Sequence, residues 1–77
     1  MEITVKLFGR LRRHLESGQE VITVQLDGQN TVNSVVQILG IDDTEIWLAR
    51  SNGRAVPKDT LLQRGDVVEL YSVIGGG

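Results

Sequence analysis

The last four residues of the sequence, Ile74-Gly75-Gly76-Gly77, are the stretch whose residue types could do chemistry. Three consecutive glycines have no side chains to pack, and each has wide backbone freedom. Fully extended, the four residues would reach roughly 13 Å beyond a folded body. A bare carboxylate on Gly77 could then enter the active site of another protein. The alternative is an ordinary frayed end, because terminal residues are disordered unless they are tied down.

Other residue types that could support chemistry are few. The sequence has no cysteine, which excludes disulfides, thiol catalysis and cysteine-ligated metals within it. His14 is the only histidine, and we interpret it as a solvated loop residue because no metal-ligand spacing surrounds it. Asp42 and Asp43 lack a third carboxylate to complete a metal site, so a solvated loop is the better interpretation. The triplet at 64–66 (RGD) matches an adhesion motif by letter, but Gly and Asp suit a turn there.

Size and composition indicate one compact soluble domain. The chain has 77 residues, of which 40% are hydrophobic and 23% charged. The net charge of −2, with scattered Lys and Arg, provides no basic stripe for nucleic acid. No apolar run approaches membrane-spanning length and no signal peptide precedes the first strand pattern. We therefore expect a cytoplasmic protein that binds neither nucleic acid nor membranes.

Two β-strands are predicted in the first third of the chain. Apolar and polar residues alternate over residues 2–8 and again over 21–26, which is the pattern of half-buried strands. We expect them to form a hairpin joined by a broad, partly helical loop. Phe8 falls on the polar face, either covered by the loop or exposed as a contact residue.

A single helix is predicted next. Thr31 is a good N-cap residue, apolar residues follow at helical spacing, and Gly40 would end the helix. Valine is a mediocre helix former, so this short helix should depend on burying its apolar stripe against a sheet. Ile41 would fasten the end of the helix to the core.

The last third of the chain predicts three more strands. Residues 45–51 are apolar on both faces, which favours a central strand. Asn52-Gly53 is a strong hairpin signal, and a brief strand over 54–56 stops at Pro57. Residues 67–74 are predicted as a central strand beside the first one, with Val68 and Leu70 facing the core. The sum is an α+β, β-grasp fold with four to five strands and one main helix, as a domain over 1–74 and a flexible glycine tail over 75–77.

Several short motifs in this order carry a resemblance to a known family. They are residues 5–9 (VKLFG), 11–12 (LR), 39–41 (LGI), 51–53 (SNG), 65–69 (GDVVE) and the terminal glycines. Each is weak alone, but together they are specific in a chain of this length that ends on Gly-Gly. The sequence resembles the ubiquitin-like sulfur carriers, the MoaD/ThiS-type β-grasp proteins of molybdopterin and thiamine biosynthesis. The Val-Ile-Gly-Gly-Gly ending is closer to the thiamine type.

The resemblance implies a carrier protein and not an enzyme. A ubiquitin-activating-type adenylyltransferase would use ATP to adenylate Gly77, and persulfide sulfur from a donor enzyme would then replace AMP. The resulting thiocarboxylate is a nucleophile that delivers sulfur to an acceptor biosynthetic enzyme. Gly75 and Gly76 would let the tail lie extended in a narrow channel. The chain itself would bind no cofactor and no metal, because its partners supply the catalytic groups.

The resemblance also implies a docking face, the side of the sheet remote from the helix. The family register would turn Trp47 and Ala49 inward and so leave their neighbours on that face. The candidate interface residues are Phe8, Leu48, Arg50, Tyr71, Val73 and Ile74. Ordinary surface hydrophobicity is the competing interpretation of this patch.

Two other functions use the same fold. One is a ubiquitin-like modifier that forms an isopeptide bond between Gly77 and lysines of other proteins. The other is a non-covalent β-grasp interaction module with an accidental glycine tail.

Overall fold

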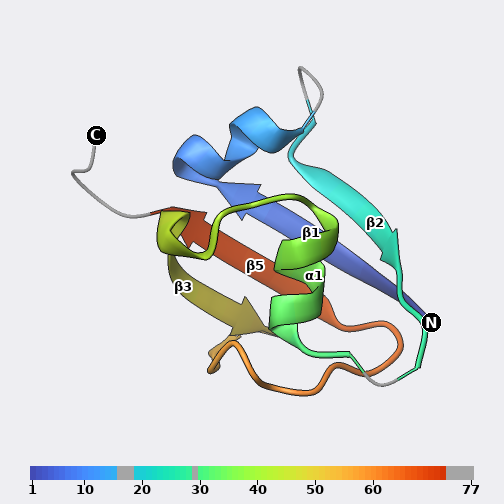
Figure 1. Cartoon of the computed structure of the whole chain (residues 1–77). Coiled ribbons are helices and arrows are strands. Elements are labelled where there is room, and N and C mark those ends of the chain that lie inside the picture. The colour runs from blue at the N-terminus through green and yellow to red at the C-terminus, as the bar shows by residue number, and fades with distance from the viewer. Residues whose placement is uncertain (16–18, 29, 73–77) are drawn as a thin grey trace.

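The computed structural model describes residues 1–15, 19–28 and 30–72, which form a five-stranded mixed sheet with one helix across one face (Figure 1). The strands are β1 (Glu2–Phe8), β2 (Val21–Gln25), β3 (Ile46–Ser51), β4 (Arg54–Ala55) and β5 (Val67–Ser72), and the helix is α1 (Val32–Ile38). Two short 3-10 helices, η1 (Gly9–His14) and η2 (Asp43–Glu45), follow β1 and precede β3. The predicted β-grasp architecture is confirmed.

The sheet is built around β5. Its strand order is β2-β1-β5-β3-β4, with β5 parallel to β1 and antiparallel to β3. β1 and β2 pair as the predicted antiparallel hairpin. Val68 and Leu70 of β5 are fully buried against the helix side, as predicted, and Tyr71 lies on the other face beside Phe8. The predicted extension of this strand to Ile74, and the domain boundary there, lie outside the described residues.

The core lies between α1 and the sheet. Val32, Val35 and Val36 form the apolar stripe of α1 and are buried on the sheet. The buried hydrophobic side chains of the described residues are Ile3, Val5, Leu7, Leu11, Val24, Leu26, Val32, Val35, Val36, Ile41, Ile46, Ala49, Leu62, Val68 and Leu70. The core therefore lies on the face of the sheet that carries α1.

Both ends of α1 have the partners that a short helix requires. The amides of Val32 and Asn33, in the first turn, donate to the carbonyls of Thr60 and Lys58 at 3.2 and 2.9 Å. At the other end Gly40 has a φ of +72°, and the amide of Ile41 donates to the Val36 carbonyl at 3.1 Å. This is a Schellman ending, and it turns Ile41 into the core as predicted.

The hairpin turn predicted at Asn52-Gly53 joins β3 and β4 and has the type I′ conformation that this pair of residues favours. Asn52 and Gly53 have φ angles of +51° and +84°. The Asn52 side chain also bonds Asp66, at 3.0 Å, and accepts the amide of Val67 at 2.9 Å. Asp66, the acid of the adhesion-like triplet, thus has a structural role in the turn before β5.

The predicted facing of β3 is wrong at Trp47. Ile46 lies opposite Ser72 and Leu48 lies opposite Tyr71, so two steps on β3 match one step on β5. Trp47 is the extra residue of this β-bulge and is 56% exposed, whereas Ile46 and Ala49 are buried. The bulge moves the inward position from Trp47 to Ile46. β3 lies between β5 and β4, as predicted for a central strand, although among the described residues β4 pairs only with Arg50 and Ser51.

The sequence places two adjacent leucines, Leu61 and Leu62, in the polar connection after Pro57, where both are predicted to close the bottom of the core. The structure places them differently. Leu62 is buried, with its amide donating to the Asn30 carbonyl at 2.8 Å. Leu61 is 59% exposed, so only half of that prediction is correct. Within the described part of the chain, no helix is long and apolar enough to cross a membrane.

Candidate docking surface at the carboxyl end of β5

Three side chains from neighbouring strands form a small row on the face of the sheet remote from α1. Phe8 ends β1, Tyr71 lies opposite it on β5, and Leu48 lies opposite Tyr71 on β3. All three are half-buried. We call these residues the aromatic patch. It lies one residue before Ser72, the last described residue ahead of the terminal glycines.

Stacking fixes the geometry of the aromatic patch. The ring centroids of Phe8 and Tyr71 are 4.6 Å apart with an angle of 7° between the ring planes. Such a contact contributes about 0.5–1.5 kcal/mol beyond area burial. The two interpretations left open for Phe8 are thus partly reconciled: a neighbouring strand, not the following loop, covers one side of the ring.

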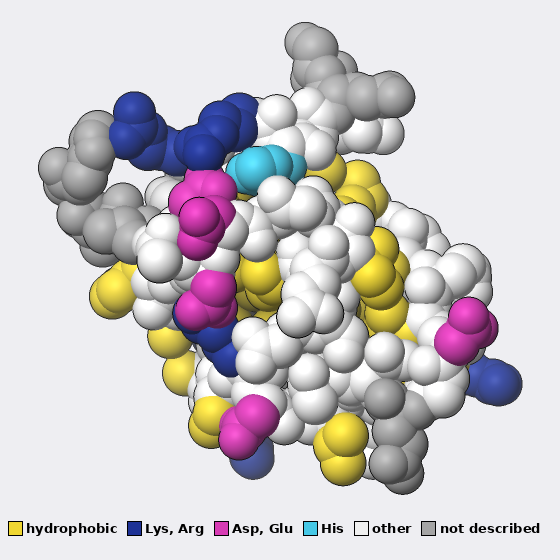
Figure 2. Space-filling view, viewed as in Figure 1, with side chains coloured by type: hydrophobic (Ala, Val, Ile, Leu, Met, Phe, Trp, Pro, Cys, Tyr) yellow, Lys and Arg dark blue, Asp and Glu magenta, His cyan; other side chains and the backbone are white. Residues whose placement is uncertain are grey.

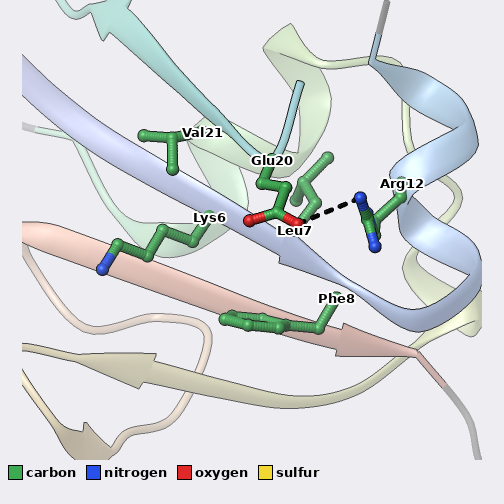
Figure 3. A pocket seen from close by; sticks show the side chains of 6 residues that line it. All are labelled: Lys6, Leu7, Phe8, Arg12, Glu20 and Val21. Carbon is green, nitrogen blue, oxygen red and sulfur yellow. Dashed lines mark hydrogen bonds and ion pairs between the residues drawn. The ribbon is translucent and has the colours of Figure 1, made fainter. Parts of the chain in front are cut away.

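A shallow hollow adjoins Phe8 on the side of β2 (Figure 3). It has a volume of about 230 Å³ and is lined by Lys6, Leu7, Phe8, Arg12, Glu20 and Val21. Arg12 and Glu20 form an ion pair at 3.2 Å across its rim. The hollow thus combines apolar side chains with the charged groups of Lys6, Arg12 and Glu20.

A row of charged side chains lies next to the aromatic patch. Glu69 lies between Lys6 and Arg50 in the register of the sheet. The Arg50 guanidinium is 3.9 Å from the Glu69 carboxylate and also donates to the Gly53 carbonyl. Arg50, a predicted interface residue, is therefore on the predicted face but already has partners within the domain.

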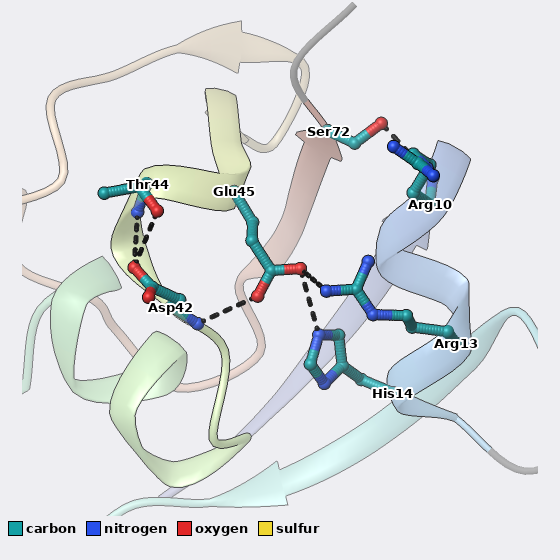
Figure 4. Close-up of polar contacts among 7 residues, drawn as sticks. All are labelled: Arg10, Arg13, His14, Asp42, Thr44, Glu45 and Ser72. Carbon is teal, nitrogen blue, oxygen red and sulfur yellow. Dashed lines mark hydrogen bonds and ion pairs between the residues drawn. The ribbon is translucent and has the colours of Figure 1, made fainter. Parts of the chain in front are cut away.

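The carboxyl end of β5 is held, on the face of the sheet that carries α1, by a contact that the sequence did not predict. Gly9 begins η1 with a φ of +63°, and the next amide, that of Arg10, donates to the Ser72 hydroxyl at 3.2 Å (Figure 4). A Cβ on Gly9 would lie 2.3 Å from this hydroxyl oxygen. Gly9 is thus required both by its backbone angle and by the close approach of Ser72. We call Gly9, Arg10 and Ser72 the Ser72 clamp.

Glu45 joins η1 to η2 close to this clamp (Figure 4). Its carboxylate pairs with Arg13, lies 3.5 Å from Nε2 of His14 and accepts the Asp42 amide at 3.2 Å. Figure 2 shows acidic and basic side chains gathered around the histidine at this end of the helix-side face. The prediction of a solvated His14 is wrong: its side chain is 20% exposed and lies against Glu45.

Asp42 and Asp43 are exposed, as predicted, and have structural partners. Asp42 accepts hydrogen bonds from the amide and hydroxyl of Thr44 at 2.9 and 2.8 Å, which lowers its pKa. Asp43 pairs with Lys58 at 2.7 Å. The described residues contain no group of three or more potential metal ligands, and these two acids lie at the start of η2.

The reactive end predicted from the sequence lies outside the described residues. These positions are Val73, Ile74, Gly75, Gly76 and Gly77. Trp47, Gly9 and Ser72 are the candidates that sequence reasoning missed, and all three lie at the end of the sheet where β5 finishes. Only Gly9 had a signal in the sequence, since a glycine directly after the aromatic residue that ends a strand favours a tight turn. Nothing local in the sequence marks Trp47 or Ser72.

The fold and this surface define a β-grasp, ubiquitin-like protein. The chain belongs to the Mut7-C ubiquitin family, whose model matches residues 1–75.

Solved structures show the same fold. The HVO 2177 protein of Haloferax volcanii is 28% identical, with a TM-score of 0.78 over 100% of this chain and 87% of that one. Small archaeal modifier protein 1 of H. volcanii is 21% identical, with a TM-score of 0.75 over 95% and 98% of the two chains. A chain from the complex of subunits 1 and 2 of the molybdopterin-converting factor of Helicobacter pylori 26695 is 20% identical, with a TM-score of 0.66 over 100% of both chains. No match to this sequence is found among curated proteins.

Proposed function

We propose that this protein is a sulfur carrier whose terminal Gly77 is adenylated and converted to a thiocarboxylate. The sulfur would serve thiamine or molybdopterin biosynthesis in the cytoplasm. The observation that carries the proposal is the aromatic patch, three half-buried apolar side chains on the open face of the sheet, at the end of the strand that continues to Gly-Gly-Gly. A partner seated on this patch would have the terminal carboxylate within reach.

The chemistry requires three partners and no catalytic group from this chain. A carboxylate oxygen of Gly77 attacks the α-phosphorus of ATP on the adenylyltransferase, and pyrophosphate leaves. The terminal sulfur of a persulfide on the donor enzyme then attacks the acyl carbon and displaces AMP. A thiol breaks the S–S bond of the resulting acyl disulfide, which releases the thiocarboxylate and leaves a disulfide behind. The acceptor enzyme consumes the sulfur and returns the carboxylate.

Glycine suits every step of this sequence. Gly77 has no Cβ to obstruct attack on its carbonyl carbon, and Gly75 and Gly76 allow close approach of an enzyme channel. The complex of subunits 1 and 2 of the H. pylori molybdopterin-converting factor supports the idea that a protein of this fold works with a partner protein.

Conjugation to other proteins is the second candidate function. Small archaeal modifier protein 1 has the same fold, and its description as a modifier supports this second candidate function. Here the acyl adenylate of Gly77 would be transferred to a lysine amine of a target, forming an isopeptide bond. A non-covalent interaction module is the third possibility.

Mass spectrometry of the protein purified from its own cells tests these functions. A carrier is expected to show a terminal peptide about 16 Da heavier, the difference between oxygen and sulfur, and to co-purify with its adenylyltransferase. Incubation with that enzyme, ATP and a persulfide donor should produce the same mass gain, and a chain that lacks Gly76 and Gly77 should not.

The other outcomes separate the alternatives. Lysines of other proteins linked to Gly77 would support the modifier instead. If neither product forms and deletion of Gly76-Gly77 leaves growth without added thiamine or molybdenum cofactor unchanged, both covalent functions are wrong.

A further inference from the structure

The Ser72 clamp has features that ordinary strand packing does not require. Ser72 follows Tyr71 in β5 and lies on the same face as the fully buried Leu70, where an apolar residue would be usual. Its hydroxyl is used by the backbone of η1 instead. A polar residue at this position therefore points to a purpose other than burial.

The hydroxyl of Ser72 supplies a cap that η1 lacks in its own sequence. Phe8 occupies the N-cap position of η1 and has no side-chain oxygen to offer to the first-turn amides. Ser72 accepts the amide of Arg10 at 3.2 Å from the neighbouring strand. The end of β1 is thereby tied to the end of β5 at the point where β5 continues toward the glycines.

The close approach at Gly9 makes this contact specific. Gly9 has a φ of +63°, and its Cα packs closely against the Ser72 side chain. A Cβ added to Gly9 would lie 2.3 Å from the Ser72 hydroxyl oxygen and would overlap it. η1 is held from its other side as well, because Arg13 and His14 lie against Glu45 at the end of η2. η1 thus has contacts on two sides, with Ser72 and with Glu45.

We infer that Ser72 and Gly9 are positioning residues for the terminal carboxylate, an inference that rests on the proposed function. The aromatic patch gives a partner its grip on the sheet, and the Ser72 clamp fixes the residue from which the last five residues continue. The aromatic patch then governs how tightly a partner binds, and the Ser72 clamp governs where the terminal segment begins. A misplacement of about 1 Å can reduce a reaction rate by roughly a hundredfold.

Adenylation kinetics with the activating enzyme that co-purifies with this protein test the inference. Ser72→Ala is expected to lower kcat roughly tenfold, because the carboxylate is less well aligned, with KM within about twofold of wild type. Ser72→Thr keeps the hydroxyl and is expected to restore most of the lost kcat. Ser51→Ala is the matched control, a half-buried serine of β3 whose hydroxyl makes no hydrogen bond among the described residues, and it should leave both constants unchanged.

Each result decides the matter. Equal kcat for wild type and Ser72→Ala, an equal loss in Ser51→Ala, or a failure of Ser72→Thr to restore the rate would overturn the positioning role. A wild-type chain that no activating enzyme adenylates would overturn the proposed function, and the role of the clamp in adenylation with it. The first result leaves the sulfur carrier standing, so the two failures are distinguishable.

Thermal unfolding of a double-mutant cycle tests the contact itself without any partner. Gly9→Ala introduces both a disfavoured φ and the overlap with the Ser72 hydroxyl, whereas Gly9→Ala/Ser72→Ala keeps only the first. Ser72→Ala alone should lower the melting temperature by about 8 °C or less. The double variant is expected to melt at or above the temperature of Gly9→Ala, and strictly additive losses would contradict the clamp.

Discussion

At the scale of single residues, Asp42 shows how an exposed side chain can still shape the structure. Its carboxylate accepts hydrogen bonds from the amide and from the hydroxyl of Thr44. Both bonds lower the pKa of Asp42, and the bond from the amide has the larger effect. Both bonds favour the charged form of the carboxylate. Asp42 therefore stabilises the start of η2 more when it is ionised than when it is protonated.

The stability of the protein should depend on pH through this residue. The folded pKa of Asp42 lies below its ordinary value of 3.8, so its contribution is complete above that value and is lost as the pH falls through the folded pKa. We expect Asp42→Asn to be less stable than wild type at pH 5 to 7, with the difference shrinking as the pH falls below about 4. Urea unfolding of both proteins at a series of pH values measures this. A difference that grows on acidification would contradict the sign.

His14 illustrates which single residues the sequence could not place. Its partner Glu45 lies 31 positions later in the chain, and no local pattern links the two. Ser72 was unrecognised for the same reason, since its partner is an amide at the start of η1. Asp42-Asp43 was placed correctly as an exposed pair because the turn chemistry there is local.

At the scale of elements, the strands and the helix follow from local patterns, and their facing mostly does too. Period-2 alternation placed Ile3, Val5 and Leu7 in the core, and helical spacing did so for the α1 stripe. The exception is β3, where residues 46–49 are all apolar, so no alternation of apolar and polar residues predicts which of them face the core. There the bulge at Trp47 decides which residue points inward, and a bulge depends on the partner strand.

The adjacent leucines after β4 give an element-scale prediction. Leu62 is buried and Leu61 is 59% exposed, so they differ in environment but not in residue type. Leu62→Ala is expected to lower the free energy of unfolding by about 2–5 kcal/mol because it removes buried methyl groups and leaves a cavity. Leu61→Ala should change it by no more than about 0.5 kcal/mol.

Urea denaturation of the two variants provides the measurement, and each serves as the control of the other. Equal losses would mean that Leu61 is covered as well. That result would contradict the burial described for the segment between β4 and β5.

At the scale of the whole molecule, the two faces of the sheet have separate roles. One face carries α1 and nearly all buried side chains, and the other carries the aromatic patch and the charged row beside it. Substitutions on the open face should therefore affect partners more than stability.

This separation predicts the behaviour of Tyr71→Asp. The substitution removes the stacked ring and places a charge where a partner would make an apolar contact. We therefore expect kcat/KM for adenylation to fall at least tenfold while cooperative thermal unfolding persists. Thr23→Asp, on the same face of the sheet but on β2, is the matched control and should be adenylated like wild type. Loss of the thermal transition in Tyr71→Asp would show instead that the ring belongs to the core.

The central place of β5 also has a consequence for synthesis of the protein. β3 has its main partner, and β1 its second partner besides β2, only after Val67–Ser72 has left the ribosome. Contacts between strands so far apart in sequence form late in folding. The strand that closes the sheet is also the strand that leads to the glycines. A chain interrupted before Val67 would lack the strand that joins the two halves of the sheet. Under the proposed function it would also lack the carboxylate of Gly77, so no truncated product would compete with the full chain for an activating enzyme.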